Sequence, residues 1–186
     1  MKLNKIMMAA VLAFGATSMM AQAANQGSGT VTFTGEIIDA ACSIAPGNID
    51  QTVTLGQISN VSLKDGRASE VQEPFKIILE DCSLATAKTV KTTFTGKTGG
   101  TAGTDTKSIG FGSGSTASGA SIVITDTNNS NAVVELGKAT TGQVLAIGDT
   151  DAELQFKAFL KGNGGALSTI KSGAFTSVVN FALSYQ

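Results

Sequence analysis

The stretch VVNFALSYQ, residues 178–186, closes the chain and decides its fold class. Large apolar side chains occupy every second position, at Val179, Phe181, Leu183 and Tyr185. Successive side chains of a β-strand point to opposite faces, so this period of two is typical of a strand with one buried face. Terminal residues are usually held loosely, and an apolar strand at the end of a chain therefore needs a neighbour. What lies beside this strand is the first question that the sequence raises.

Short runs with the same alternation recur along the rest of the chain. They are TVTFT (30–34), QTVTL (51–55), PFKIILED (74–81), TVKTTFTG (89–96) and AELQFKAFLK (152–161), together with the β-branched run ASIVITD (120–126). No stretch has the period of 3.6 residues that an amphipathic helix requires. We therefore predict an all-β sandwich of short strands. Residues 96–121 are rich in glycine, serine and threonine, and we expect a surface excursion there with a short strand near 109–111.

The first 23 residues have the pattern of a cleaved secretory signal. Lys2 and Lys5 precede an apolar run at 6–16, and Ala21-Gln22-Ala23 fits a signal peptidase site. The apolar run is shorter than the roughly 20 residues that span a bilayer, so we expect no membrane insertion of the mature chain. Cleavage after Ala23 leaves 163 residues, which suits one domain with one core.

The composition argues against several classes of function. The mature chain has no histidine or tryptophan, and without Lys2 and Lys5 its formal charge is −3. This charge gives no reason to expect a nucleic-acid partner. The absence of histidine removes the usual Ser-His and Cys-His pairs of nucleophilic enzymes. We expect no enzyme, no cofactor and no metal site.

Two other groups of residues have the composition of possible sites. The run GSGSTA (112–117) loosely fits a dinucleotide-binding loop, but a strand-like run follows it where that motif requires a helix. A glycosidase-like carboxylate pair could be drawn from Asp126, Glu135, Asp149, Asp151 and Glu153. We interpret Asp149 and Asp151 instead as turn-forming residues before a strand.

The two cysteines and the leading arm are the remaining features. Cys42 and Cys82 are an even pair in an exported chain, which predicts one disulfide. Closing a loop of about 40 residues stabilises a fold by about 4 kcal/mol in the chain-entropy model. Residues 24–34 would form an extended arm with Gly29, Val31 and Phe33 on one face. The alternative is an ordinary first strand of the same sandwich.

The order of these segments resembles the major pilins of the chaperone–usher class, the shaft subunits of type 1 and P pili. The resemblance rests on GTVTFTGEIIDAACSI (29–44), QTVTLGQIS (51–59), FKIILEDCS (75–83) and the C-terminal strand. Its specific features are the interval between Cys42 and Cys82, Gly173 as the fourteenth residue from the end, and the penultimate Tyr185.

The resemblance implies an incomplete immunoglobulin-like sandwich that lacks its last strand, formed by residues 35–186. In that family a periplasmic chaperone lends a strand, an outer-membrane usher assembles the subunits, and the arm of the next subunit replaces the chaperone by donor-strand exchange. The implied donor residues are Gly29, Val31 and Phe33. The implied residues of the acceptor groove and chaperone-binding strand are Gly173, Val179, Phe181, Leu183 and Tyr185.

The implied function is that of a structural subunit of a bacterial surface fimbria that supports adhesion, with identical and related pilins as head-to-tail partners. A minor adaptor subunit is an alternative within the class. A tip adhesin would need a further domain, for which 163 residues leave no room. An alternative from another class is a self-contained secreted sandwich that binds a carbohydrate or other ligand, with residues 24–34 folded onto their own domain.

Overall fold

The computed structural model describes residues 29–38, 40–86 and 88–186. The predicted signal segment and the first residues of the predicted arm lie outside this part of the chain. The chain divides into two units between Ile37 and Ile38, shortly after the predicted boundary at residue 34. The second unit, called the body below, holds every strand of the described residues.

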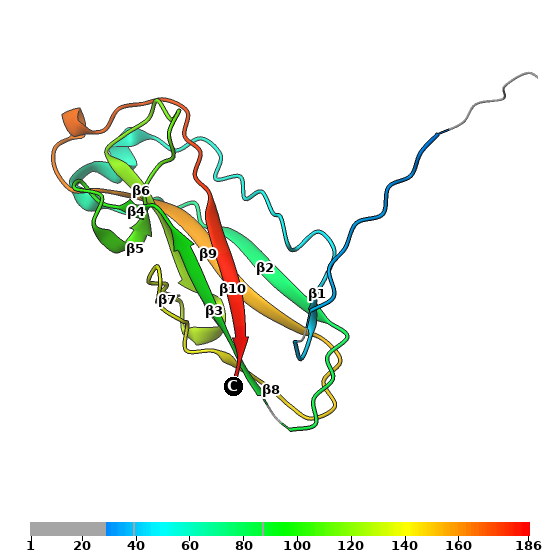
Figure 1. The fold of residues 1–186 in the computed structure, drawn as a ribbon. Coiled ribbons are helices and arrows are strands. Elements are labelled where there is room, and N and C mark those ends of the chain that lie inside the picture. The colour runs from blue at the N-terminus through cyan, green and yellow to red at the C-terminus, as the bar shows by residue number, and fades with distance from the viewer. Residues whose placement is uncertain (1–28, 39, 87) are drawn as a thin grey trace, which may run out of the picture. The chain divides into compact units, whose positions relative to one another are not determined.

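The body consists of two antiparallel sheets (Figure 1). The larger sheet has the order β1-β2-β9-β6-β5-β4, with β7 beside β6. Its strands are β1 (Ser43–Ile44), β2 (Glu73–Glu80), β4 (Thr98–Gly99), β5 (Asp105–Ile109), β6 (Ala120–Asp126), β7 (Ala132–Val133) and β9 (Ala152–Gly162). The smaller sheet has the order β10-β3-β8, with β10 (Val179–Tyr185), β3 (Lys88–Gly96) and β8 (Gln143–Leu145). Three short 3-10 helices complete the described elements: η1 (Asn60–Gly66), η2 (Thr127–Asn129) and η3 (Leu167–Thr169).

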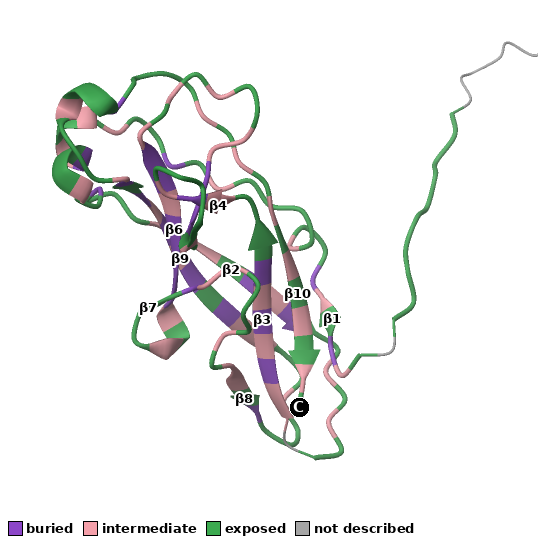
Figure 2. Ribbon diagram, turned by 60° about the vertical axis from the view of Figure 1, so that its left-hand side comes forward, coloured by how far each residue is buried: buried purple, intermediate pink, exposed green. Residues whose placement is uncertain are grey.

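The central strands form where the alternation predicts them. In β9, Leu154 and Phe156 are buried while Gln155 between them is exposed. In β3, Val90 and Phe94 are buried, and Figure 2 shows the alternating bands along this strand. The prediction of an all-β sandwich is confirmed, because the apolar faces of both sheets meet in one core.

The core has two clusters. The larger one lies between the sheets and is centred on three phenylalanine rings. Phe94 meets Phe156 edge to face at 5.1 Å between ring centroids, and Phe75 stacks on Phe156 at 5.4 Å. The smaller cluster contains Leu55, Leu63, Ala120, Ala158, Leu160 and Ile170. Each aromatic pair adds about 0.5–1.5 kcal/mol beyond the burial of its area.

Two expectations about the strands are wrong. The run QTVTL (51–55) is not a strand, although Val53 is half-buried and Leu55 is buried as its alternation predicts. Among the described residues of 29–38 and 40–44, only Ser43–Ile44 forms a strand. The alternation reports one buried face, whereas a strand also needs a hydrogen-bonding neighbour, and the described residues supply none here.

The glycine-rich segment is less peripheral than we expected. It contains β4 and β5, and β5 ends at Ile109, where the short strand was expected to begin. Gly99 and Ser108 are buried, and a Cβ on Gly99 would collide with the Ser108 hydroxyl. Small side chains here allow close packing of backbones rather than a surface loop.

Candidate strand-binding groove

The last strand has one paired edge and one free edge. β10 pairs with β3 along its whole length, from Val179 opposite Gly96 to Tyr185 opposite Val90. Within residues 29–38, 40–86 and 88–186, no strand pairs with its other edge. A free edge presents a row of unpaired N–H and C=O groups, which is a template for another strand.

The inward face of β10 is only half-buried. Val179, Phe181, Leu183 and Tyr185 all pack against the larger core cluster, yet none is fully buried. The outward residues Asn180, Ala182 and Ser184 are exposed, so the strand has the two faces that the sequence predicts. Figure 2 shows these half-buried and exposed bands along β10. The inner side of the strand therefore still has uncovered apolar surface.

A groove of about 590 Å³ runs beside this strand. Residues 177–181 form one wall, and Ile44 with residues 49–55 forms the other. Its floor consists of core side chains from five strands: Phe75, Ile77, Phe94, Ile109, Ile122, Ile124 and Ala158. Both rims carry exposed apolar residues, since Ile49 is 62% and Val178 is 78% exposed. The groove opens directly onto the hydrophobic core.

The chemistry of the groove suits an extended chain with alternating apolar side chains. Such a chain can form main-chain hydrogen bonds with the free edge of β10 while every second side chain rests on the floor. The polar residues Asp50, Gln51 and Asn180 lie along the walls rather than converging on one point. Small-molecule sites usually combine an apolar cavity with a few convergent polar groups.

Tyr185 extends the apolar face beyond the groove. Leu183 and Tyr185 belong to the same face of β10, but the lining of the groove ends at Phe181. The Tyr185 hydroxyl is buried and has no hydrogen-bond partner in the described residues. Burial raises the pKa of the Tyr185 phenol, because its charged form is poorly solvated there.

Gly173 lies outside the groove lining. Its backbone approaches Thr116 and Ala117 so closely that a Cβ would lie 2.8 Å from the Ala117 nitrogen. The Thr116 N–H donates to the Ala174 carbonyl at 2.9 Å in the same contact. Gly173 therefore allows the chain leading into β10 to pack against residues 112–118.

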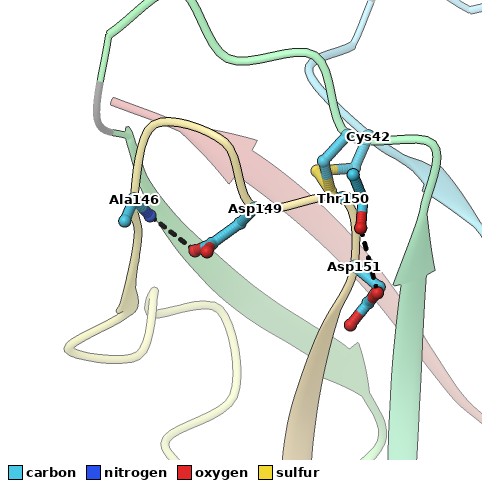
Figure 3. Close-up of a disulfide and its surroundings, with 6 residues drawn as sticks. Cys42, Ala146, Asp149, Thr150 and Asp151 are labelled. Atoms are coloured by element: carbon cyan, nitrogen blue, oxygen red, sulfur yellow. Dashed lines mark hydrogen bonds between the residues drawn. A yellow bond between two sulfur atoms is a disulfide. The ribbon is translucent and has the colours of Figure 1, made fainter.

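The predicted disulfide is present between Cys42 and Cys82. It ties the chain just before β1 to the chain just after β2, and the Cys82 N–H donates to the Thr150 carbonyl at 3.1 Å. Figure 3 shows Asp149 directed at Ala146, whose N–H it accepts at 2.6 Å. The turn role predicted for Asp149 is confirmed. The bridge anchors the end of the groove wall that contains Ile44.

The predicted donor residues lie in the first unit. Residues 29–37 are outside any strand, and the side chains of Val31 and Phe33 are exposed. A Cβ on Gly29 would have no neighbouring atom within 4 Å. Their role as donor residues stays a prediction.

Sequence reasoning missed most of the groove. It identified the β10 wall, but not the opposite wall at residues 49–55 or the isoleucine floor of Ile109, Ile122 and Ile124. The run QTVTL carried the available signal, because it has the pattern of a strand without an evident partner. Residues 51–55, which pair with no strand in the described part of the chain, and β10, which has one free edge, lie on the two walls of one groove.

A sandwich with an apolar groove beside a free inner edge defines a class of protein that can be completed by a strand from another chain. The model of the fimbrial protein family matches residues 31–186, and the chain belongs to this family. The Fimbria A protein of Serratia marcescens is 53% identical over 186 residues, covering all of both chains. The major MR/P fimbria protein of Proteus mirabilis strain HI4320 is 42% identical over the same full coverage.

Solved structures show the same fold. A chain from the structure of a chaperone–usher pilus that explains rod uncoiling has a TM-score of 0.68 and 28% identity, covering 87% of this chain and 97% of that one. The P pilus rod subunit PapA has a TM-score of 0.63 and 25% identity, covering 79% of this chain and all of that one. The fold is thus the immunoglobulin-like fold of chaperone–usher pilins, and the protein is a pilus subunit. Among the described residues, no helix has the length and apolar character needed to cross a membrane.

Proposed function

We propose that the protein is the repeating shaft subunit of a bacterial surface fimbria and polymerises by donor-strand exchange. The observation that carries this proposal is the apolar groove beside the free edge of β10. The arm, residues 24–34, would insert into the groove of a second copy. Because each subunit both gives and receives a strand, the contact is head-to-tail and propagates as a fibre.

The dimensions and side chains of the arm support this role. Eleven residues in strand geometry reach about 36 Å, and the seven residues of β10 span about 23 Å. Val31 and Phe33 would rest on the groove floor, each worth about 1.5–3 kcal/mol if fully buried. Gly29 would let the inserted backbone pass close to the wall, where a side chain would collide.

The proposal includes the path of assembly. Residues 1–23 act as a cleaved signal, and residues 35–186 form the pilin sandwich domain. An exposed apolar groove with a free edge invites aggregation, so a periplasmic chaperone that fills it is needed before an outer-membrane usher adds the subunit to the fibre. The finished fimbria lies outside the cell and supports adhesion. The role is structural and requires no catalytic step or cofactor.

A shaft subunit fits better than an adaptor. The relatives described above include a major fimbrial protein, and the solved rod chains cover most of this chain. Electron microscopy of cells with and without the protein tests this point. Loss of whole fibres is expected for a shaft subunit, whereas fibres of ordinary length would point to the adaptor.

Substitutions on the two faces of the arm test the donor role. Phe33→Asp and Gly29→Leu should leave the subunit folded in the periplasm but abolish surface fibres. Thr32→Asp introduces the same charge on the opposite face and should assemble normally. Electron microscopy and immunoblotting of surface and periplasmic fractions give the readout. Normal fibres from Phe33→Asp would contradict the assigned donor face.

A further inference from the structure

Charge is distributed unevenly along the body. β9 has 11 residues, from Ala152 to Gly162, which at strand geometry is about 36 Å. Its two ends therefore mark two well-separated ends of the body. The residues around the start of β9 are mainly acidic, and those around its end are mainly basic.

The acidic end is defined by four carboxylates that line one surface depression: Glu80, Asp81, Asp151 and Glu153. Lys76 pairs with Glu153 at 2.6 Å. In the described part of the chain, Glu80, Asp81 and Asp151 take part in no ion pair. All three are exposed, whereas Lys88, which begins β3 opposite Leu145, is half-buried.

The basic end is defined by four exposed cations: Lys64, Arg67, Lys161 and Lys171. Backbone contacts connect two of them, since Lys161 bridges to Ala68 and the Gly162 N–H donates to the Arg67 carbonyl at 3.0 Å.

Three carboxylates lie at the basic end as well: Asp65, Asp105 and the exposed Glu70, which follows the Ser69 whose N–H donates to the Leu160 carbonyl. Asp65 lies 3.6 Å from the Lys64 ammonium. Asp105 is held by the Ser108 hydroxyl and the Lys107 N–H, and these hydrogen bonds, helped by the charge of Lys161, lower its pKa. The four cations, together with Lys107 beside Asp105, exceed these three carboxylates, so the end keeps a positive balance.

The groove connects the two ends. Its Ile44 end adjoins the acidic end, because Ser43 pairs with Glu80 in the β1–β2 ladder. Its other end adjoins the basic end, because Leu55 packs in one cluster with Leu63 of η1 and Leu160 of β9. The arm is covalently attached just before β1, and hence to the acidic end of its own body.

We propose that the acidic end of each subunit docks on the basic end of the subunit whose groove holds its arm. This inference rests on the proposed function and names a second contact between the same two copies. When an arm lies in the groove of an acceptor subunit, the body of the donor subunit can lie at either end of that groove, depending on the direction in which the arm runs. At the Leu55 end its carboxylates meet cations, whereas at the Ile44 end they meet the carboxylates of the acceptor. Opposite charges attract and like charges repel, so the first arrangement is the one that the charges favour.

The contact should act mainly on the rate of subunit addition. Complementary charged surfaces steer partners together and speed association, and exposed charges are screened by salt. The screening length falls from about 14 Å at about 50 mM NaCl to about 4 Å at about 500 mM. Polymer growth of the wild-type chain should therefore slow as the salt concentration rises.

Charge reversal tests the contact. The mature chain is refolded from denaturant at the two salt concentrations, and growth is followed by light scattering. Lys161→Glu with Lys171→Glu should slow growth at least about threefold at low salt, and the difference should vanish at high salt. Adding Glu80→Lys and Asp151→Lys to the same chain reverses the charges at the acidic end as well. The two ends then attract each other again, and the growth rate at low salt should be restored. Lys138→Glu with Lys157→Glu makes the same change in net charge away from both ends and should grow at the wild-type rate.

A synthetic peptide of residues 24–34 separates this inference from the proposed function. The peptide can fill the groove but has no body, so excess peptide should stop growth of the wild type and of the Lys161→Glu/Lys171→Glu variant equally. If the peptide stops the growth of neither the wild type nor the variant, the proposed function is overturned. If the peptide stops both chains equally and the variant grows at the wild-type rate at low salt, the docking of the two ends is overturned. The docking is also overturned if the variant with all four substitutions grows as slowly at low salt as the variant with only Lys161→Glu and Lys171→Glu.

Discussion

Tyr185 continues the apolar face of β10 beyond the groove lining, and its phenol can report whether a donor strand covers that face. It is the only tyrosine, and the chain has no tryptophan. Its hydroxyl is buried and has no hydrogen-bond partner among the residues that the structure describes, and burial raises the pKa of its phenol. A donor strand that covers the half-buried face of β10 would remove more water from this side chain. The phenol therefore reports how complete the sandwich is.

The first prediction concerns this pKa. The folded state holds the phenol proton more tightly than the unfolded state, whose pKa is about 10. The stability of the fold is therefore unaffected below that pH and falls as the pH rises above it. We expect the phenolate absorbance of the polymer to appear at a higher pH than that of the unpolymerised Phe33→Asp variant. Tyr185→Phe should abolish the phenolate signal. An ordinary phenol pKa in the polymer would contradict the idea that a donor strand covers Tyr185.

The second prediction concerns a close backbone contact at Gly162. This last residue of β9 is buried, and a Cβ there would collide with the Leu63 carbonyl of η1. Gly162→Ala should lower the free energy of unfolding by about 1–3 kcal/mol, the usual effect of overpacking. Urea unfolding in the Phe33→Asp background measures this change. Gly35→Ala, where no atom lies within 4 Å, is the matched control and should leave the value unchanged.

At the scale of elements, the sequence predicted strands better than it predicted their partners. β2, β3, β9 and β10 follow from alternation, since a period of two records which side chains face the core, and β6 follows from its β-branched run. The same pattern in residues 51–55 did not give a strand, because pairing depends on a neighbour that the pattern cannot show. The β10 wall of the groove was therefore predictable, and the opposite wall was not. The position of Ile109 in the groove floor was not predictable, because it lies in a glycine-rich segment that was expected at the surface. The close packing of these glycines depends on residues distant in the sequence.

The disulfide carries the third prediction. β1 has only two residues in its ladder with β2, and the bridge at Cys42 adds a covalent anchor to the hydrogen bonds of this groove wall, such as the one from the Ala45 N–H to the Ile78 carbonyl. Replacing both cysteines by serine should lower the free energy of unfolding by about 2–5 kcal/mol. The amount of subunit in the periplasm and of fibres on the cell should fall with it, as measured by immunoblotting and microscopy. Unchanged fimbriation would show that the wall holds its place without the bridge.

At the scale of the whole molecule, the open groove makes stability depend on concentration. A chain whose core is completed by a second copy gains stability by mass action, so its folded state and its polymer form together. The fourth prediction is that the mature chain, refolded alone, is unstable at low concentration and grows into polymers as the concentration rises. Phe33→Asp should stay monomeric and melt at a lower temperature than the polymer, because its groove remains uncovered while its body is unchanged.

Calorimetry and light scattering on the same samples separate the possible outcomes. If a second copy supplies the missing strand, the melting temperature of the wild type should rise with chain concentration, and that of Phe33→Asp should not. Excess arm peptide should raise the melting temperature of Phe33→Asp while leaving it monomeric, because the peptide fills the groove without offering a new one. Sharp, reversible melting of the full mature chain as a monomer, with no response to the peptide, would mean that the sandwich is already complete within one chain. Residues 24–34 would then be an ordinary part of their own fold.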